Sequence, residues 1–461
     1  MTATELRAGL GNGDLSAREV VGAHLARIEE VNPGLNAIVT LTADQAMRDA
    51  AAADEAHAAG EPLGILHGLP TAHKDLAATR GVRTTNGSPI YADHVPDHDA
   101  IIVERAKLAG AISVGKTNTP EFGAGSQTFN QVFGATRNPY DTDRTCGGSS
   151  GGAAVALAAG MVPIADGSDM GGSLRNPASF CNVVGFRPSP GRVPASPTAT
   201  PWSHLSTDGP MARTVDDVAL LLAAQAGPDP RSPIALETAG SAFLPPLTEP
   251  DALRVAWAPD LGGLPIDREV TTALAGVPAV FEQLGHRVDE SAPDLTGAME
   301  IFDTMRAWNF AMKLGDTIRT HRDQMKDTLV WNVERGLGLS MADHQRASRL
   351  QAALYERVVE FFGEFDVLLC PVAQVPPFTL DTEYVTEIDG HSFSTYIEWM
   401  RACTDVTVMN VPAISVPAGF TEDGLPIGLQ IVGPPHGDQR VLQVAKQFEA
   451  ATEIGTRRPR L

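Results

Sequence analysis

Apolar and polar residues in the first part of the chain follow two different periods. Residues 16–31 repeat apolar side chains at helical spacing behind a serine, and the Asn-Pro-Gly at 32–34 predicts the end of that helix. Residues 36–41 and 69–76 have the pattern of strands and flank an alanine-rich helical stretch. This alternation is typical of α/β proteins, and Lys74 lies near the end of the second strand.

The same alternation continues through the next segment. Residues 99–110 predict a helix and 111–115 a strand, while 150–160 predict a helix that opens directly from a glycine-rich turn. A further strand is expected at 163–165. The glycine-rich turn therefore lies between two regular elements.

The middle of the chain differs from the rest in amino-acid composition and in hydrophobic periodicity. Two segments rich in Pro, Ser and Thr, 186–210 and 227–250, are predicted to be long surface loops rather than interdomain linkers. Residues 294–364 show helical periodicity with scattered aromatic and methionine side chains. We expect this helical region to vary with substrate and to cap the site, although core packing also produces such a pattern.

The C-terminal part returns to strands. Residues 366–370, 413–419 and 428–433 predict strands, and 438–451 a final helix. No internal repeat is present. We therefore expect one large α/β domain over 1–461, with a mixed, twisted sheet flanked by helices.

Composition narrows the class of protein and of partner. Of the 461 residues, 43% are hydrophobic and 20% charged, as in ordinary globular proteins. The formal net charge of −21 repels phosphates and anionic lipids, so we expect no nucleic-acid or membrane partner. The apolar run at 153–163 is too short to span a bilayer, and the N-terminus lacks a secretory signal.

The cysteines indicate the compartment. Cys146, Cys181, Cys370 and Cys403 are scattered singly, without a CxxC pair or a disulfide framework. We interpret them as reduced thiols, which predicts a cytoplasmic protein.

Three segments carry residues suited to nucleophilic chemistry: Lys74 in GLPTAHKDL, CGGSSGG at 146–152, and DMGGSLRNPASFC at 169–181. A serine hydroxyl needs an adjacent base to take its proton. A neutral lysine can serve if burial lowers its pKa by roughly three units from about 10.4. Taken singly, each feature has an ordinary structural explanation, because Gly-Gly-Ser turns are common and lysines are mostly exposed.

Together these segments resemble a known family. The run TCGGSSGGAAVALAAGMVPIADGSDMGGSLRNPASFCNVVGFRPSPGRV closely resembles the core of the amidase signature enzymes, and the spacing from Lys74 to Ser149 and on to Ser173 agrees. The resemblance extends from the N-terminus through GKTNTPEFG to GLPIGLQIVG near the C-terminus. It is weakest over about 230–400, where such enzymes vary with substrate.

The resemblance implies an amidase that cleaves an amide to acid and amine through an acyl-enzyme. Ser173 would attack the carbonyl, Ser149 would relay its proton, and neutral Lys74 would receive it. The family likeness also implies a cis peptide bond between Gly148 and Ser149. Esters and carbamates would fit the same chemistry.

An oxyanion hole is implied by the same resemblance. Its donors would be the backbone N–H groups of Met170, Gly171, Gly172 and Ser173, where glycines let the main chain approach closely. Replacing Gly172 with a bulky residue should be severe, because losing one such donor costs on the order of a hundredfold in turnover.

Neighbouring residues are assigned lesser roles. Ser150 and Arg175 either orient the loops or are plain structural polar residues, and Cys181 is expected to be an inert packed thiol. The resemblance implies no organic cofactor and no metal. The expected partner is a small-molecule amide, ester or carbamate, and a homodimer is left open.

Two other catalytic or binding motifs compete with this interpretation. Residues 148–152 fit G-x-S-x-G with Ser150 central and His436 as a base, but the preceding residues are predicted as loop rather than strand. Residues 110–117 fit the Walker pattern, yet the run between the glycines is apolar and follows a helix. Neither motif has the required context.

Three further alternatives concern metal, binding and partners. His94 and His98 have a spacing that can bind zinc, but Pro96 lies between them and no supporting ligand pattern is present. A non-catalytic binding protein would have lost catalytic residues, which this chain retains. A glutaminase subunit of a tRNA-dependent amidotransferase would need partner chains, and ACTDVTVMNVPAISVP at 402–417 departs from the pattern expected there.

Overall fold

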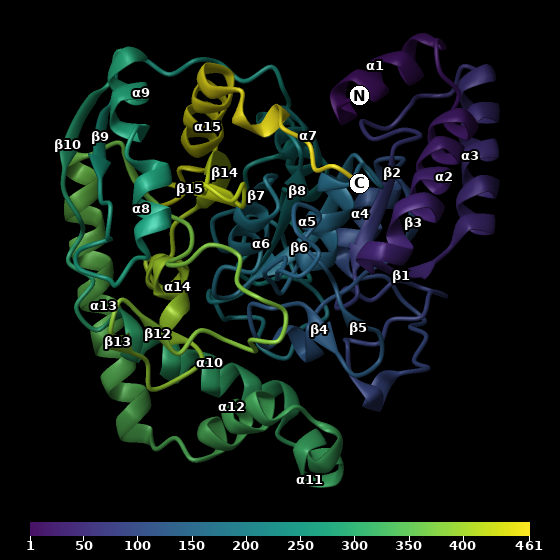
Figure 1. The fold of residues 1–461 in the computed structure, drawn as a ribbon. Coiled ribbons are helices and arrows are strands. Elements are labelled where there is room, and N and C mark those ends of the chain that lie inside the picture. Colours follow the sequence, from purple (N-terminus) through teal and green to yellow (C-terminus); the bar gives the residue numbers. More distant parts are fainter.

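A mixed sheet of 11 strands forms the centre of the computed structural model, which describes residues 1–461 (Figure 1). Along the sheet the strands run β1-β3-β2-β6-β8-β7-β14-β15-β11-β9-β10. These strands are β1 Ile38–Leu41, β2 Pro70–Lys74, β3 Ile112–Thr117, β6 Ile164–Asp169, β7 Val184–Arg187, β8 Thr207–Ala212, β9 Arg254–Trp257, β10 Arg287–Glu290, β11 Val367–Pro371, β14 Ala413–Phe420 and β15 Pro426–Val432. Two small hairpins comprise β4 Phe129–Asn130 with β5 Gly134–Ala135, and β12 Glu387–Ile388 with β13 His391–Ser392.

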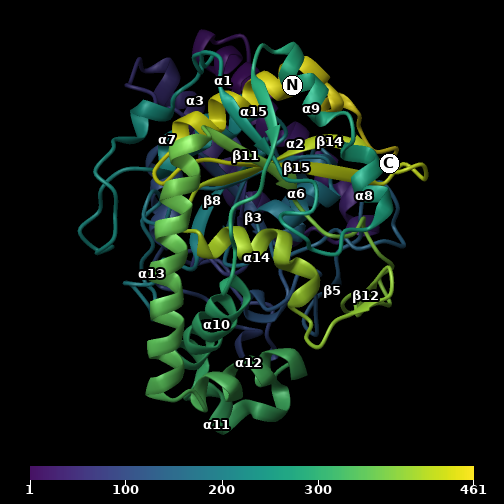
Figure 2. The same ribbon diagram turned by 90° about the vertical axis from the view of Figure 1, so that its left-hand side faces the viewer.

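Helices surround this sheet (Figure 2). They are α1 Ala3–Asn12, α2 Ala17–Leu35, α3 Ala43–Ala58, α4 Ile101–Leu108, α5 Gly151–Ala158, α6 Arg175–Phe180, α7 Val215–Gln225, α8 Arg268–Leu274, α9 Val277–Gln283, α10 Ala298–Leu314, α11 Thr317–His321, α12 Asp327–Leu337, α13 Met341–Glu364, α14 Arg401–Val408 and α15 Asp438–Thr452. Short 3-10 turns are η1 Pro89–Tyr91, η2 Glu121–Gly123, η3 Gly240–Phe243, η4 Arg322–Gln324, η5 Glu398–Met400 and η6 Ile454–Thr456. None of the helices combines the length and the apolar character needed to cross a bilayer.

The sheet mixes parallel and antiparallel pairs, as expected. β2 runs parallel to β3 and β6, β9 runs parallel to β10 and β11, and β8, β14 and β15 pair antiparallel with their neighbours. Central strands such as β2 and β11 are buried along their whole length, because helices cover both faces. The predicted α/β class with a mixed sheet flanked by helices is confirmed.

The predicted helix at 16–31 is longer than expected. It begins behind a capping box in which Ser16 Oγ accepts from Glu19 N–H and Glu19 accepts from Ser16 N–H. It then continues through Pro33 to Leu35, so the predicted stop at 32–34 is wrong. Pro33 lies in the last turn, where it cannot donate to the Glu29 carbonyl, but only two residues of helix follow it, and Asn36 ends the helix with φ of 54°.

The prediction of a surface loop over 186–210 is wrong at both ends. β7 extends to Arg187 and β8 begins at Thr207, in the middle of the sheet. Gly209 and Pro210 weaken the strand pattern of β8, but β7 pairs only with the two residues after Pro210, so the N–H that proline lacks is not needed in that ladder. A Cβ on Gly209 would lie 2.5 Å from the carbonyl oxygen of Phe186, so no side chain fits there.

The helical periodicity of 294–364 corresponds to α10 through α13; α10, α11 and α12 lie below the sheet in both ribbon views, whereas α13 rises beside it (Figures 1 and 2). α10 packs against α12, α13 and α14. A small apolar cluster joins this region to η2, with Phe122 among residues of α10 and α12 such as Phe310 and Leu329. α10 is thereby held next to the glycine- and serine-rich core.

Candidate active site

Lys74, Ser149 and Ser173 line one cavity of about 330 Å³. They come from three places in the fold: the end of β2, the turn before α5, and the turn between β6 and α6. The cavity is closed on its other sides by the loop at 191–206 and by α10. The three residues singled out from the sequence therefore meet in space.

Lys74 is a buried lysine with hydroxyl partners. Its Nζ donates to Ser149 Oγ at 2.8 Å, to Ser150 Oγ at 2.9 Å and to Ser168 Oγ at 3.1 Å. Burial lowers the pKa of Lys74 to about 7, although the charge of Asp208 opposes this shift. A substantial fraction of Lys74 is therefore neutral near neutral pH, as the sequence analysis required of a lysine base.

The turn before α5 fixes Ser149. The peptide bond from Gly148 to Ser149 is cis, as the resemblance implied. Ser126 Oγ donates to the carbonyl of Gly148 at 3.0 Å, and Thr128 Oγ1 donates to the carbonyl of Gly147 at 2.8 Å. These bonds from a separate loop hold the turn so that Ser149 Oγ meets Lys74.

Ser173 lies in a tight turn after β6. Its hydroxyl makes no hydrogen bond within the protein and faces the cavity, while its carbonyl accepts from Ser150 N–H at 3.1 Å. Gly172 has φ of 105°, and a Cβ on it would lie 2.6 Å from Cys403 Cβ. The turn therefore needs glycine at 172 to present Ser173.

The predicted oxyanion donors divide into two groups. Gly172 N–H donates to Asp169 Oδ1 at 2.9 Å. The N–H groups of Met170, Gly171 and Ser173 have no acceptor within the protein. Of the four predicted donors, Gly172 N–H is therefore the one that already has an acceptor, the Asp169 carboxylate.

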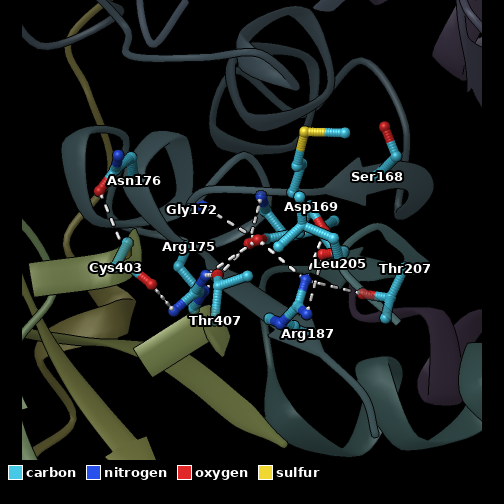
Figure 3. A network of polar contacts seen from close by, with 12 residues as sticks. Ser168, Asp169, Gly172, Arg175, Asn176, Arg187, Leu205, Thr207, Cys403 and Thr407 are labelled. Carbon is cyan, nitrogen blue, oxygen red and sulfur yellow. Dashed lines mark hydrogen bonds and ion pairs between the residues drawn. The ribbon is translucent and has the colours of Figure 1, made fainter. Parts of the chain in front are cut away.

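A buried ion cluster fixes the base of this turn (Figure 3). Arg175 contacts both carboxylate oxygens of Asp169, with Nη2 to Oδ1 at 2.9 Å and Nε to Oδ2 at 3.0 Å. Arg187 Nη1 donates to the main-chain oxygen of Asp169 and contacts Oδ1 at 3.3 Å. Burial is the largest influence on the pKa of Asp169 and raises it, but the charges of Arg175 and Arg187 together with the hydrogen bonds from Arg175 and Gly172 N–H outweigh burial and hold this pKa well below its usual range.

Arg175 also joins three elements. Its Nη1 donates to Gln430 Oε1 on β15 at 2.7 Å and to the carbonyl of Cys403 on α14 at 3.1 Å, and its Nη2 donates to Thr407 Oγ1 at 2.8 Å. Arg175 is fully buried and does not line the cavity. Its place is that of a loop-orienting residue, one of the two roles considered from the sequence.

The sequence did not identify Asp166, an acidic residue next to Lys74. Asp166 on β6 accepts from the main-chain N–H of Lys74 at 2.9 Å and bonds the ring Nδ1 of His73. Its carboxylate also lines the cavity. His73 adjoins Lys74 in the chain, but no pattern in the sequence pointed to Asp166 as its partner.

The sequence led us to expect that 294–364 caps the site, but it did not say which residues of α10 line the cavity. Arg306, Asn309, Phe310 and Lys313 recur at helical spacing and face the cavity. Thr200 Oγ1 donates to Asn309 Oδ1 at 2.8 Å, which ties the loop at 191–206 to this wall. These residues lie in or near the region where the family resemblance is weakest, so only the structure identifies them.

The competing motifs do not form sites. His436 does not line the cavity, and Ser150 Oγ is bonded to Lys74. Residues 110–117 contain the whole of β3, which follows α4, so the order of elements is the reverse of that around a phosphate-binding loop. His98 contacts Asp97, whereas His94 packs edge-on against Tyr91.

The four cysteines are buried and unpaired. Burial raises the pKa values of Cys146, Cys370 and Cys403 to about 12 and that of Cys181 well above its usual value. The thiolate forms are therefore scarce near neutral pH, which agrees with inert packed thiols.

Comparison with known proteins extends this picture. The family model described as Amidase matches residues 19–442. An acylamidase of Rhodococcus erythropolis is 36% identical over 464 residues, covering 100% of this chain and 97% of the relative. The A subunit of the glutamyl-tRNA(Gln) amidotransferase of Synechococcus sp. (strain CC9605) is 36% identical over 490 residues, covering 100% of this chain and 98% of that subunit.

Among solved structures, a bacterial aryl acylamidase of the amidase signature enzymes matches with a TM-score of 0.92 at 30% identity, covering 100% of this chain and 99% of that one. The family match includes the cavity, the buried lysine and both serine-bearing turns. By sequence and by fold, the chain belongs to the amidase signature family.

Proposed function

We propose that this protein hydrolyses small-molecule carboxylic amides to acid and amine through an acyl-enzyme on Ser173. Amide hydrolysis follows from membership of the amidase signature family and from its acylamidase relatives. The observation that carries the assignment of residues is the buried Lys74 amine, 2.8 Å from Ser149 Oγ in the cavity that Ser173 also lines.

The proposed reaction begins with proton movement. Ser173 Oγ attacks the carbonyl carbon while its proton passes to Ser149, and Ser149 gives its own proton to neutral Lys74. Ser149 and Ser173 share no hydrogen bond in the free enzyme, so their contact forms when substrate is bound. Lys74 then returns a proton through Ser149 to the leaving amine, and water hydrolyses the acyl-enzyme by the same route.

The tetrahedral intermediate needs donors for its oxygen. We propose the unoccupied N–H groups of Met170, Gly171 and Ser173 for this role, because they follow one another around the turn that presents the nucleophile. Gly172 contributes differently, since its N–H bond to Asp169 locks the turn. Such preorganised donors act strongly because they need no reorganisation when the charge develops on the oxygen.

The substrate would bind between the turn at 170–173 and α10. We propose that the helical region 294–364 caps the site, because α10 supplies the wall facing the serines. Phe310 and Phe122 give this wall apolar surface, and Arg306 and Lys313 give it positive charge. We propose that the enzyme prefers amides with aryl or other apolar groups. Esters and carbamates are proposed as additional substrates.

A glutaminase subunit of an amidotransferase is the second candidate, because a relative with that name is 36% identical over the whole chain. We favour the stand-alone enzyme, since residues 402–417 depart from the pattern expected of that subunit. Four buried unpaired thiols support the proposal of a cytoplasmic protein.

The test uses the purified chain without partners. Aryl amides, primary amides including glutamine, esters and carbamates are offered separately, and acid release is followed by mass spectrometry. We expect aryl amide turnover without added protein, and an acyl adduct on the peptide that carries Ser173 after rapid quenching. The amidotransferase role would instead be supported if glutamine were the one substrate hydrolysed, and if its hydrolysis required the other subunits of an amidotransferase. Size-exclusion chromatography of the same sample reports whether the chain forms a homodimer.

A further inference from the structure

Two charged side chains in the cavity have no charged partner. Asp208 on β8 and Lys313 on α10 both line it, and neither takes part in a hydrogen bond or an ion pair within the protein. Neither charge is fixed in a salt bridge, so each acts through the cavity on the groups around it, including the other.

Asp208 lies beside the group that holds Lys74. In the antiparallel ladder between β6 and β8, Asp208 is directly opposite Ser168, whose Oγ accepts from Lys74 Nζ at 3.1 Å. Directly opposed residues place their side chains on the same face, about 5 Å apart at Cβ. The Asp208 carboxylate thus faces the Lys74 amine across one intervening side chain.

The other acids near Lys74 are compensated. Asp166 accepts from the main-chain N–H of Lys74 and from the ring of His73, which is also on β2. Asp169 lies between the two buried arginines described above. Asp208 is therefore the one nearby carboxylate whose charge meets no donor.

The positively charged side chains near the cavity also differ in whether they have hydrogen-bond partners. On β3, Lys116 donates to Thr79 Oγ1 at 2.8 Å. On α10, Arg306 donates to Asn332 Oδ1 at 3.2 Å and to the Tyr396 hydroxyl. Lys313 Nζ makes no hydrogen bond or ion pair and lies 5.7 Å from the centroid of the Phe122 ring, and its side chain is exposed to solvent.

We propose that Asp208 and Lys313 are positioning residues that set, in opposite directions, the pH at which Lys74 releases its proton. The negative carboxylate favours the ammonium form of Lys74, whereas the positive amine of Lys313 disfavours it. Neither residue touches the reacting atoms, so each acts through Lys74. The inference rests on the proposed function in one respect, namely that neutral Lys74 is the base.

The charge balance around Lys74 agrees with this geometry. Burial has the largest effect on the pKa of Lys74 and lowers it, Asp208 is the charge that most strongly raises it, and Lys313 lowers it. Burial in turn raises the pKa of Asp208 to about 6, so most of its carboxylate is ionised at the midpoint of the Lys74 titration.

The experiment compares pH profiles of kcat/KM for the wild type, Asp208→Asn, Lys313→Gln and the double variant. Activity needs neutral Lys74, so it rises with pH through the acidic limb. Asp208→Asn should move the midpoint of that limb down by about 0.5–1 pH unit, at or below the lower end of shifts caused by a nearby opposite charge. Lys313→Gln should move it up by a smaller amount, because solvent screens Lys313, and the double variant should lie between the two.

Matched controls are Asp44→Asn on α3 and Lys107→Gln on α4, which remove the same charges outside the cavity. Both should keep the wild-type midpoint. Thermal unfolding of every variant shows whether it folds, and Asp208→Ser replaces Asp208→Asn if that variant does not.

A second measurement does not depend on turnover. Protein with 13C-labelled lysine methylene carbons reports the titration of Lys74 by NMR, and the signal is assigned by its absence in Lys74→Met. Unchanged midpoints in both cavity variants, shifts in the same direction, or a lower rate without any shift would overturn the inference. Full activity of Ser173→Ala would instead overturn the proposed function, so the two failures are distinct.

Discussion

Lys74 is a residue whose proposed role depends on its burial. It ends a strand buried at every position, and its amine meets three serine hydroxyls rather than a carboxylate. A carboxylate in contact would hold Lys74 charged, whereas hydroxyls can accept from or donate to a neutral amine. The same burial that supports catalysis should therefore carry a cost in stability.

That cost gives a prediction about stability and pH. Lysine in the unfolded chain keeps its proton up to about pH 10.4, whereas folded Lys74 loses it near pH 7. Between these values the unfolded state binds more protons, so the free energy of unfolding rises with pH through this Lys74 contribution. In Lys74→Met this rise between about pH 7 and 10 should flatten, as measured by urea denaturation, while the exposed control Lys107→Met keeps the wild-type slope.

Ser173 gives the direct prediction about catalysis. Ser173→Ala should lower kcat/KM for an aryl amide by about a thousandfold or more, because the acyl-enzyme cannot form. Its thermal midpoint should be unchanged, since the Ser173 hydroxyl makes no bond within the protein. Ser126→Ala supplies a contrast: it removes the bond to the Gly148 carbonyl and should reduce both activity and stability. A Ser173→Ala enzyme with undiminished turnover would refute the assignment.

Gly172 tests the turn geometry. Gly172→Ala would place a Cβ 2.6 Å from Cys403 Cβ at a φ of 105°. We expect loss of activity by at least about a hundredfold, because the turn must shift the neighbouring N–H donors. Gly134→Ala is the matched control, because Gly134 also has positive φ but open space around it. That variant should lose about 1 kcal/mol of stability and keep its activity.

At the scale of elements, α6 is too short to be stable by itself, and the ion pair and hydrogen bonds of Arg175 hold it in place. It has only six residues, and Arg175 at its start joins β6, α14 and β15. Arg175→Met should lower the free energy of unfolding by about 3–5 kcal/mol, since it strips one cation from a buried carboxylate. Arg346→Met, which breaks an exposed pair with Glu300, should cost at most about 1 kcal/mol. If urea denaturation gave the same loss of unfolding free energy for both variants, the buried ion pair would contribute no more to stability than the exposed one.

Comparing the predicted with the observed elements shows how much of the fold the sequence predicts. Periodicity located most strands and helices, and the glycine- and serine-rich segments with Lys74 named three residues that share the cavity. Periodicity failed for β8, where Gly209 and Pro210 hide a central strand, and for the end of α2, which continues two residues past Pro33. The engagement of the Gly172 N–H by Asp169 depends on a three-dimensional turn, so no linear pattern could reveal it.

The α10 wall shows the same limit. Arg306, Asn309 and Lys313 have the helical spacing of any amphipathic face, and the sequence does not say what that face meets. Asp208 was equally hidden, because its relation to Lys74 runs through a strand ladder between β6 and β8. Residues that act through space rather than through motifs require the fold.

For the whole molecule, the strand order places distant segments together. β14 and β15 lie between β7 and β11, so the last part of the chain fills the middle of the sheet. A chain ending at residue 400 would lack both strands and α14, and we expect it to be insoluble or to lack a cooperative thermal transition. A chain ending at residue 456 removes only a tail that is mostly exposed and should melt close to the full-length protein by circular dichroism.

This strand order has a consequence for synthesis. While the ribosome still holds the C-terminal segment, β7 and β11 remain two open edges with unpaired backbone groups. The nascent chain cannot bury them until the β14–β15 hairpin has left the exit tunnel. Chaperone dependence of this protein should therefore last until the β14–β15 hairpin has emerged, and the nascent chain should be most prone to aggregate just before that point.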